Sequence, residues 1–173
     1  MDRKRRRLVL GIGLATLGGM SAAWAFWPAG VPRIGAREAG SKGPLPLKDL
    51  AANEILVVKS PYCGCCTKWA EYLAAAGWKT RLRDETDLVG VRAGAGVPES
   101  MAGCHTAFVD GYVVEGHLPA PAIRALVEQK PDLDGIAVPG MPADAPGMGG
   151  GGVQAVYGFR AGKNAGLFMR AQG

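Results

Sequence analysis

Aromatic side chains are scarce in this 173-residue chain, at 7% of the sequence, and no long repeat or heptad run is present. The scarcity argues against a surface that stacks nucleic-acid bases, and the missing periodicity excludes solenoids and coiled coils. No catalytic Ser-His-Asp arrangement, catalytic carboxylate pair or phosphate-binding glycine loop with its lysine can be argued from the sequence. Because 48% of the residues are apolar and 20% are charged, the chain can form a packed domain beside an export segment.

Excess positive charge is confined to the N-terminus. The formal net charge is +5, but residues 1–25 carry five basic residues against Asp2, which leaves 15 basic and 14 acidic residues in the rest of the chain. A nearly neutral remainder does not describe a DNA-binding surface. We therefore expect no nucleic-acid partner.

Residues 1–27 have the pattern of an export signal. A basic run precedes the 20-residue apolar stretch Leu8–Trp27, and Ala23-Trp24-Ala25 fits the small-residue rule for signal cleavage. The paired arginines are similar to those of twin-arginine signals, although the usual Phe-Leu-Lys is absent. The alternative is an uncleaved membrane anchor, with Leu8–Trp27 as the one membrane contact. Both readings predict a periplasmic protein, with a flexible linker over residues 28–52 that is rich in Pro, Gly and Ala.

The body of the chain predicts an α/β fold with a thioredoxin-like order, β-α-β-(α)-β-β-α, over residues 53–146. Apolar runs, helical periodicity and an Asp-Gly turn signal predict strands at 54–59, 78–83, 106–109 and 112–115, and helices at 65–76, 87–92 and 119–129. A short apolar run follows at 136–138. Beyond it we expect an irregular C-terminal extension, in which residues 147–173 form a Gly-rich tail with a terminal β-hairpin.

Four cysteines carry the reactive chemistry. Three form Cys63-Gly64-Cys65-Cys66, and the fourth, Cys104, precedes His105. Ordinary structural disulfides fit this spacing poorly, because a bridge between adjacent cysteines is strained and at most one relaxed bridge forms inside the cluster. The cluster lies at the predicted start of a helix, where the helix dipole favours thiolate. Thiolate is both a nucleophile and a soft-metal ligand, so the sequence predicts reactive sulfur in either role.

Further soft donors lie nearby in the sequence, and we include them as candidate metal ligands. Each also has an ordinary structural interpretation: hydrogen-bonded or surface histidines, and methionines that fill apolar gaps. The full candidate set is Cys63, Cys65, Cys66, Cys104, His105, His117, Met141 and Met148. A sulfur-rich set favours copper, with Cu(I) preferred, in a small cluster with bridging thiolates. Zinc would call for paired C-x₂-C ligands, and export disfavours an iron–sulfur centre.

The cysteine segment resembles a thioredoxin active site. Tyr62-Cys63-Gly64-Cys65-Cys66 is similar to Trp-Cys-Gly-Pro-Cys, with Cys65 in place of the middle proline, and His105 falls where thioredoxins carry their cis-proline. This resemblance implies that Cys104 and His105 lie beside the cluster. It also supports an alternative function, an exported thiol–disulfide oxidoreductase with Cys63 as nucleophile and Cys66 as resolving thiol. A third alternative is a structural zinc or disulfide module.

A longer set of motifs resembles one bacterial family. The matching segments are Val58–Cys66, Cys104–Ala107, Asp110–His117, Val138–Pro142 and Pro146–Met148. They are similar to the domain of unknown function 411 family, which includes CopG-like periplasmic copper-resistance proteins, with Val58 where tyrosine is common. The resemblance extends over residues 55–168 and implies a thioredoxin-like fold that binds copper through cysteine and histidine for resistance, handling or redox cycling. The expected partners are copper ions and a periplasmic copper exporter, chaperone or redox protein.

Overall fold

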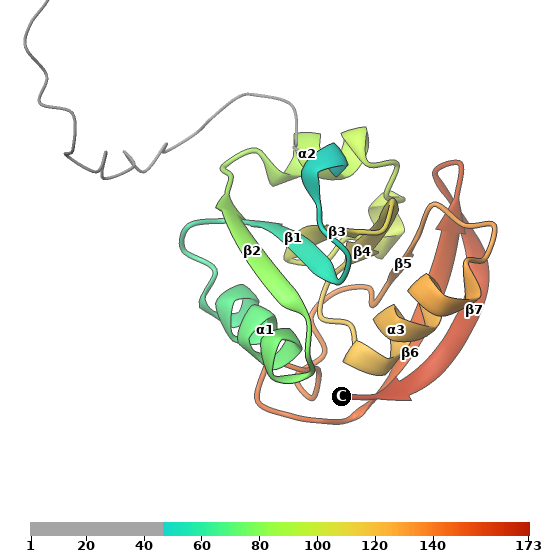
Figure 1. The fold of residues 1–173 in the computed structure, drawn as a ribbon. Coiled ribbons are helices and arrows are strands. Elements are labelled where there is room, and N and C mark those ends of the chain that lie inside the picture. Colours follow the sequence, from blue (N-terminus) through green and yellow to red (C-terminus); the bar gives the residue numbers. More distant parts are fainter. Residues whose placement is uncertain (1–46) are drawn as a thin grey trace, which may run out of the picture. The chain divides into compact units, whose positions relative to one another are not determined.

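The computed structural model describes residues 47–173 (Figure 1). The predicted signal or anchor, and most of the predicted linker over residues 28–52, lie outside the described residues. Within the described part, no helix is long and apolar enough to cross a membrane.

The described residues form a mixed α/β structure, as predicted. The strands are β1 (Glu54–Lys59), β2 (Lys79–Asp84), β3 (His105–Val109), β4 (Tyr112–Glu115), β5 (Gly135–Ala137), β6 (Val153–Arg160) and β7 (Lys163–Gln172). The helices are α1 (Gly64–Ala75), α2 (Leu88–Gly94) and α3 (Ala120–Gln129), with short 3-10 turns at Leu47–Asp49 and Glu99–Met101. Up to α3 the element order is the predicted one; the thioredoxin-like relationship itself stays a prediction.

All seven strands belong to one sheet, in the order β2-β1-β3-β4-β5-β6-β7. The β1–β2 and β4–β5 pairs are parallel and the other pairs are antiparallel. The predicted Asp-Gly hairpin is confirmed, since Asp110 and Gly111 both have positive φ, at 46° and 82°, as a type I′ turn requires.

The C-terminal part contains the terminal β-hairpin that the sequence predicts, formed by β6 and β7. It is more regular than predicted in one respect, because the hairpin joins the sheet through β5 instead of lying in an irregular extension. Inward-facing residues of β6 alternate with outward-facing ones, which is the pattern of a half-buried strand. The glycines at 149–152 suggested a loose tail, but they precede this hairpin rather than interrupt it.

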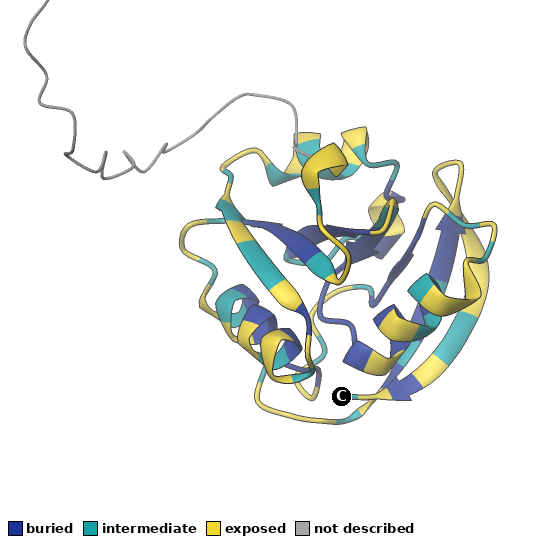
Figure 2. Cartoon of the chain, in the orientation of Figure 1, coloured by how far each residue is buried: buried dark blue, intermediate teal, exposed yellow. Residues whose placement is uncertain are grey.

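Apolar residues pack on both faces of the sheet. On β1, Ile55 and Val57 belong to the cluster with Trp69 of α1 and Ile123 of α3, whereas Leu56 and Val58 belong to the cluster near α2. Figure 2 shows the central strands in dark blue and the outer sides of the helices in yellow. With both faces covered, the end of β1 and the start of β3 are fixed in position, and these two points carry the cysteine segments.

Candidate metal centre

The turn from β1 into α1 positions three of the cysteines. Ser60 O accepts hydrogen bonds from Cys63 N at 3.0 Å and from Lys59 Nζ at 3.1 Å. Lys59, which is buried, also pairs with Asp84 of β2 at 3.0 Å. Cys63 is the N-cap of α1, and its Sγ accepts from Cys66 N at 3.3 Å. The cysteine sulfurs therefore lie at the N-terminus of the helix, as the sequence predicts.

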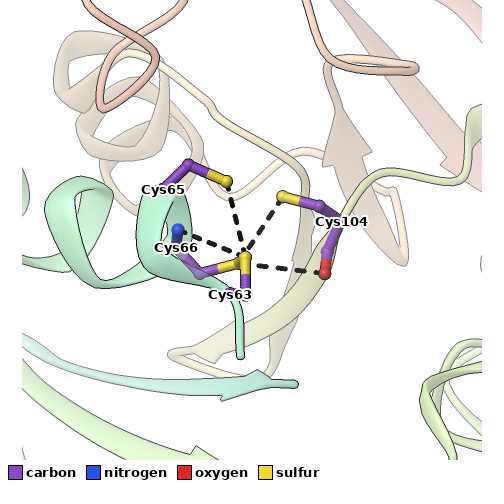
Figure 3. Close-up of side chains that lie close together, drawn as sticks. All are labelled: Cys63, Cys65, Cys66 and Cys104. Atoms are coloured by element: carbon purple, nitrogen blue, oxygen red, sulfur yellow. Dashed lines mark hydrogen bonds between the residues drawn. A yellow bond between two sulfur atoms is a disulfide. The ribbon is translucent and has the colours of Figure 1, made fainter. Parts of the chain in front are cut away.

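The four sulfur atoms form a chain of close neighbours (Figure 3). Cys63 and Cys66 are joined by a disulfide, with a Cα–Cα distance of 5.4 Å. The Sγ of Cys65 lies 3.4 Å from that of Cys63, and the Sγ of Cys104 lies 3.6 Å from that of Cys66. Cys65 and Cys104 are free, half-buried thiols. A single disulfide inside the cluster agrees with the expectation of at most one bridge there.

Strand pairing brings Cys104 to the cluster. β3 runs antiparallel to β1, and its first residue, His105, lies opposite Lys59 at the end of β1. Cys104 therefore precedes β3 at the same end of the sheet where Cys63 follows β1. This strand pair therefore brings Cys104 next to Cys66, although the two residues are 38 positions apart in the sequence.

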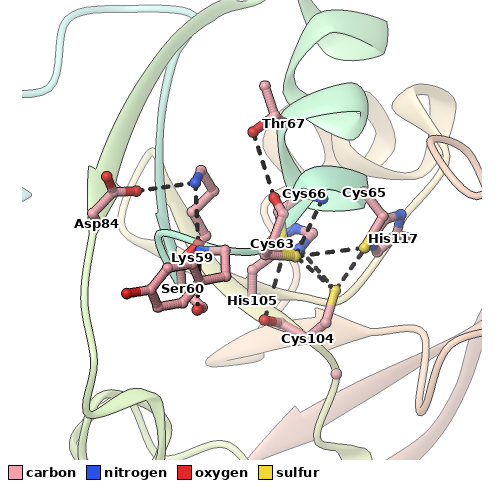
Figure 4. Close-up of a disulfide and its surroundings, with 12 residues drawn as sticks. Lys59, Ser60, Cys63, Cys65, Cys66, Thr67, Asp84, Cys104, His105 and His117 are labelled. Carbon is pink, nitrogen blue, oxygen red and sulfur yellow. Dashed lines mark hydrogen bonds and ion pairs between the residues drawn. A yellow bond between two sulfur atoms is a disulfide. The ribbon is translucent and has the colours of Figure 1, made fainter.

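Two buried imidazoles complete the cluster (Figure 4). His117 Nε2 lies 3.0 Å from Cys104 Sγ, and His117 Nδ1 lies 2.6 Å from Pro146 O. Because a carbonyl oxygen can only accept, Nδ1 carries the proton and the lone pair of Nε2 faces the sulfur. His105 Nδ1 lies 3.4 Å from Cys104 Sγ, while its Nε2 is buried without a hydrogen-bond partner. The His105 ring packs on Trp69, with centroids 4.3 Å apart.

Burial determines the protonation of these groups. It lowers the pKa of His105 to about 3, with a further contribution from the charge of His117. It also lowers the pKa of His117, against the opposing effect of the Pro146 carbonyl. Burial, then Cys65 by charge and hydrogen bonding, raises the pKa of Cys104 to about 12. Both imidazoles are thus neutral, as metal ligation requires, and the thiol of Cys104 needs a cation to become thiolate at neutral pH.

One buried acid was not among the residues singled out from the sequence. Glu115, the last residue of β4, is fully buried and accepts hydrogen bonds from Gly103 N at 2.7 Å and Thr106 Oγ1 at 2.6 Å. Burial raises its pKa, and these two hydrogen bonds and Arg92 oppose the rise. The signal in the sequence was an acidic residue at the end of an apolar strand, two residues before His117.

The donor atoms fall into two groups that can each hold a metal ion. One is Cys63, Cys65, Cys66 and Cys104; the other is Cys66, Cys104, His105 and His117. Within each group all ligand atoms lie within 4.8 Å of one another. The groups share Cys66 and Cys104, and thiolates are able to bridge two soft ions. The orphaned, buried Nε2 of His105 also fits a site built for an additional ligand. The residues present therefore fit a soft metal.

The two methionines lie in the loop between β5 and β6. Met141 is 57% exposed, and Met148 is half-buried. Pro146 O, which holds His117, is two residues before Met148. Gly147 lies against α1, since a Cβ there would be 2.7 Å from Trp69 N. Ligation by either methionine stays a prediction.

Comparisons with known proteins agree with the motif resemblance. Residues 101–148 match the family described as "Protein of unknown function, DUF411". A solved structure of "Copper resistance protein copG", Form 1, is 40% identical with a TM-score of 0.62, and the match covers 69% of this chain and 98% of that one. Form 2 is also 40% identical with a TM-score of 0.62, covering 68% and 96%. No curated protein matches the chain.

Proposed function

The chain belongs to the CopG-like DUF411 family, and from that premise we propose that it is a periplasmic copper-binding protein that holds Cu(I) for copper resistance, handling or redox cycling. One observation carries the proposal. Four sulfurs and two imidazoles, drawn from three segments of the chain, converge in two overlapping groups. The two solved forms of a copper resistance protein, each 40% identical to this chain, support copper as the metal.

The donor chemistry favours Cu(I) over the alternatives. Thiolate, thioether and imidazole are soft or intermediate donors that suit Cu(I). A single zinc ion needs four tetrahedral ligands, so six cysteine and histidine donors exceed its requirement. Because Cys66 and Cys104 belong to both groups, we expect them to bridge copper ions in a small cluster. Cys63 and Cys65 would supply the remaining ligands of the first group, and His105 and His117 those of the second.

Reduction of the disulfide precedes full loading in this proposal. The Cys63–Cys66 bridge removes two thiolates from the first group and one from the second. An external two-electron reductant converts the bridge to two thiols, which lose their protons on metal binding. Met141 and Met148 remain candidate thioether ligands from the loop beside the cluster. We expect a larger loss of Cu(I) affinity for Met148→Leu than for Met141→Leu, because Met148 follows the residue that packs on α1.

A second candidate function is thiol–disulfide exchange, which the disulfide itself favours. Cys63 is half-buried at the helix N-terminus, whereas Cys66 is fully buried. This arrangement suits Cys63 as nucleophile and Cys66 as resolving thiol, and a thioredoxin-like fold would be consistent with it. The two functions differ at Cys65 and His105. Cys65→Pro and His105→Pro should weaken copper binding but retain exchange activity.

The proposal extends to export, which rests on the predicted signal, and to partners, which rest on the family resemblance. The predicted signal over residues 1–27 would take the chain to the periplasm, cleaved or as an anchor. A copper-binding protein there would exchange copper with an exporter, a chaperone or a redox protein. Fractionation of cells that express the full chain, followed by N-terminal sequencing, tests both location and cleavage.

The decisive experiment is a Cu(I) titration of the full chain, reduced and kept without oxygen, against a chelator competitor. We expect more than one copper per chain, with binding lost in Cys65→Ser and Cys104→Ser and retained in Ser100→Ala, an exposed control. Weak copper binding together with turnover of a disulfide substrate would support the oxidoreductase instead. Unfolding of the chain on loss of any single cysteine would support a structural module instead, and stable folding of the Cys63→Ser/Cys66→Ser double variant would argue against one.

A further inference from the structure

Glu115 is a fully buried acid that neither group of candidate metal ligands includes. A buried carboxylate is costly unless it is well hydrogen-bonded. Both of its oxygens have a partner: Oε1 accepts from Gly103 N at 2.7 Å, and Oε2 accepts from Thr106 Oγ1 at 2.6 Å.

The two partners flank the ligand pair. Gly103 comes immediately before Cys104, and Thr106 comes immediately after His105. One carboxylate therefore holds the chain on both sides of the Cys104–His105 dipeptide. Arg92 of α2 also holds this segment, because its Nη1 donates to Gly103 O at 3.4 Å.

The backbone around this carboxylate has no spare room. A Cβ on Gly103 would lie 2.6 Å from Gly116 Cα, and a Cβ on Gly116 would lie 2.6 Å from Val138 O. Gly116 N also donates to His105 O at 3.0 Å. The segment with Cys104 and the segment leading to His117 are thus in backbone contact, and Glu115 is the side chain that ties them together.

We propose that Glu115 is a positioning residue of the metal centre, which holds the Cys104–His105 segment so that both donors face Cys66 and His117. The proposal rests on the proposed copper function for its purpose. Its structural claim, that Glu115 orders the Cys104 thiol, applies equally to the metal-free protein. Mutation of residues that orient metal ligands without binding the metal typically lowers metal affinity by about 10–100-fold.

A carboxylate suits this role better than a neutral side chain. Gly103 N–H is an obligatory donor, and the Thr106 hydroxyl donates to the second oxygen, so the carboxylate accepts two charge-assisted bonds on one short side chain. Glutamine keeps an acceptor oxygen for Gly103, while its neutral amide meets the Thr106 hydroxyl as a donor and without the charge. Glu115→Gln therefore preserves the shape with weaker bonds, whereas Glu115→Ala removes both bonds.

The test compares Cys104 with Cys65 inside the same reduced, metal-free full chain. Alkylation rates of the two thiols are measured by peptide mass spectrometry for the wild type, Glu115→Ala, Glu115→Gln and Thr106→Val, with Glu128→Ala on the exposed side of α3 as the control. We expect the Cys104-to-Cys65 rate ratio to rise at least about threefold in Glu115→Ala, less in Glu115→Gln and Thr106→Val, and not in the control. Thr106→Val is the decisive variant, because it removes one hydrogen bond of Glu115 but keeps the carboxylate charge, which itself contributes to the raised pKa of Cys104. In a parallel Cu(I) competition, affinity should fall at least about tenfold in Glu115→Ala, with partial recovery in Glu115→Gln.

Several results would overturn the proposal. A wild-type rate ratio in Glu115→Ala is one, and a parallel rise of both rates is another, because it reports general loosening of the fold. If Glu115→Ala does not fold, wild-type ratios in both Glu115→Gln and Thr106→Val are enough to reject the role. If the wild-type chain binds no copper, the copper proposal fails alone, and the alkylation ratio still decides whether Glu115 orders Cys104.

Discussion

His117 Nε2 lies 3.0 Å from the Sγ of Cys104, while the other nitrogen of the same ring is held 2.6 Å from Pro146 O. The carbonyl fixes the tautomer and the ring orientation, so the nitrogen lone pair points at the sulfur. A loop more than 25 residues downstream thus determines how a histidine at the end of the β3–β4 hairpin meets the cysteine cluster.

His117→Asn distinguishes the roles of the two ring nitrogens. The asparagine amide can still donate to Pro146 O, but it has no counterpart of Nε2 at the sulfur. We expect Cu(I) affinity to fall at least about tenfold, while the free energy of unfolding of the metal-free chain changes by about 1 kcal/mol or less. Chelator competition and urea denaturation measure the two quantities. Wild-type affinity in this variant would remove His117 from the ligand set.

The oxidised chain should bind less copper than the reduced chain. The Cys63–Cys66 disulfide leaves Cys65, Cys104 and the two histidines as the cysteine and histidine donors, and disulfide sulfur is not thiolate. We expect Cu(I) stoichiometry to fall in the oxidised form and to return after anaerobic reduction. Metal analysis after gel filtration of both forms measures this. Equal stoichiometry would show that Cys63 and Cys66 do not contribute ligands.

Local sequence explains why so much of the cysteine site could be anticipated. Cys63, Cys65 and Cys66 lie within four residues at a strand-to-helix junction, so their position depends on short-range rules. The expectation that Cys104 and His105 lie beside the cluster comes only from the resemblance to a thioredoxin active site, and the β1–β3 register is what brings them there in the structure.

Long-range contacts explain what could not be anticipated. His117 follows the last strand of the hairpin, where alternation no longer says which way a side chain points; Gly116, with φ of 81°, turns the chain and brings the ring inward. Glu115 resembles a solvent-facing acid at a strand end until its partners Gly103 and Thr106 are known. The β6–β7 hairpin joins the sheet through β5. This pairing is non-local, and the glycine-rich segment before β6 gives no sign of it in the sequence.

Acidification should destabilise the metal-free chain through His105. Because burial lowers its pKa from 6.5 to about 3, the folded state binds this proton less readily than the unfolded state. The contribution to stability is fully present above pH 6.5 and is lost as pH falls toward 3. Between pH 7 and pH 5 the loss from this one group is about 2 kcal/mol. His117, with a lowered pKa, acts in the same direction, and Glu115, with a raised pKa, acts in the opposite one.

Comparison with His105→Phe isolates this contribution, since phenylalanine keeps a ring against Trp69 but does not titrate. Urea unfolding of the oxidised, metal-free forms at pH 7 and pH 5 gives the change in the free energy of unfolding with pH for the wild type and for the variant. We expect stability to fall more steeply with acid in the wild type than in the variant. Identical pH dependence would mean that the His105 ring is not a buried neutral group in the folded chain.

Gly147 should be the least tolerant glycine of the loop that holds His117. Its φ is 80°, and a Cβ there would lie 2.7 Å from Trp69 N and 3.0 Å from Cys65 O. Gly147→Ala combines left-handed backbone strain with a clash against the first turns of α1, which together cost about 2–4 kcal/mol.

The matched control is Gly140→Ala, because Gly140 has φ of 72° and nothing within 4 Å of an added Cβ. The control should lose only the backbone contribution, about 1–2 kcal/mol. Since displacement of residue 147 also moves Pro146 O away from His117 Nδ1, Cu(I) affinity should fall in Gly147→Ala and not in Gly140→Ala. Equal stability and equal affinity in the two variants would show that the loop does not hold the histidine through this close approach.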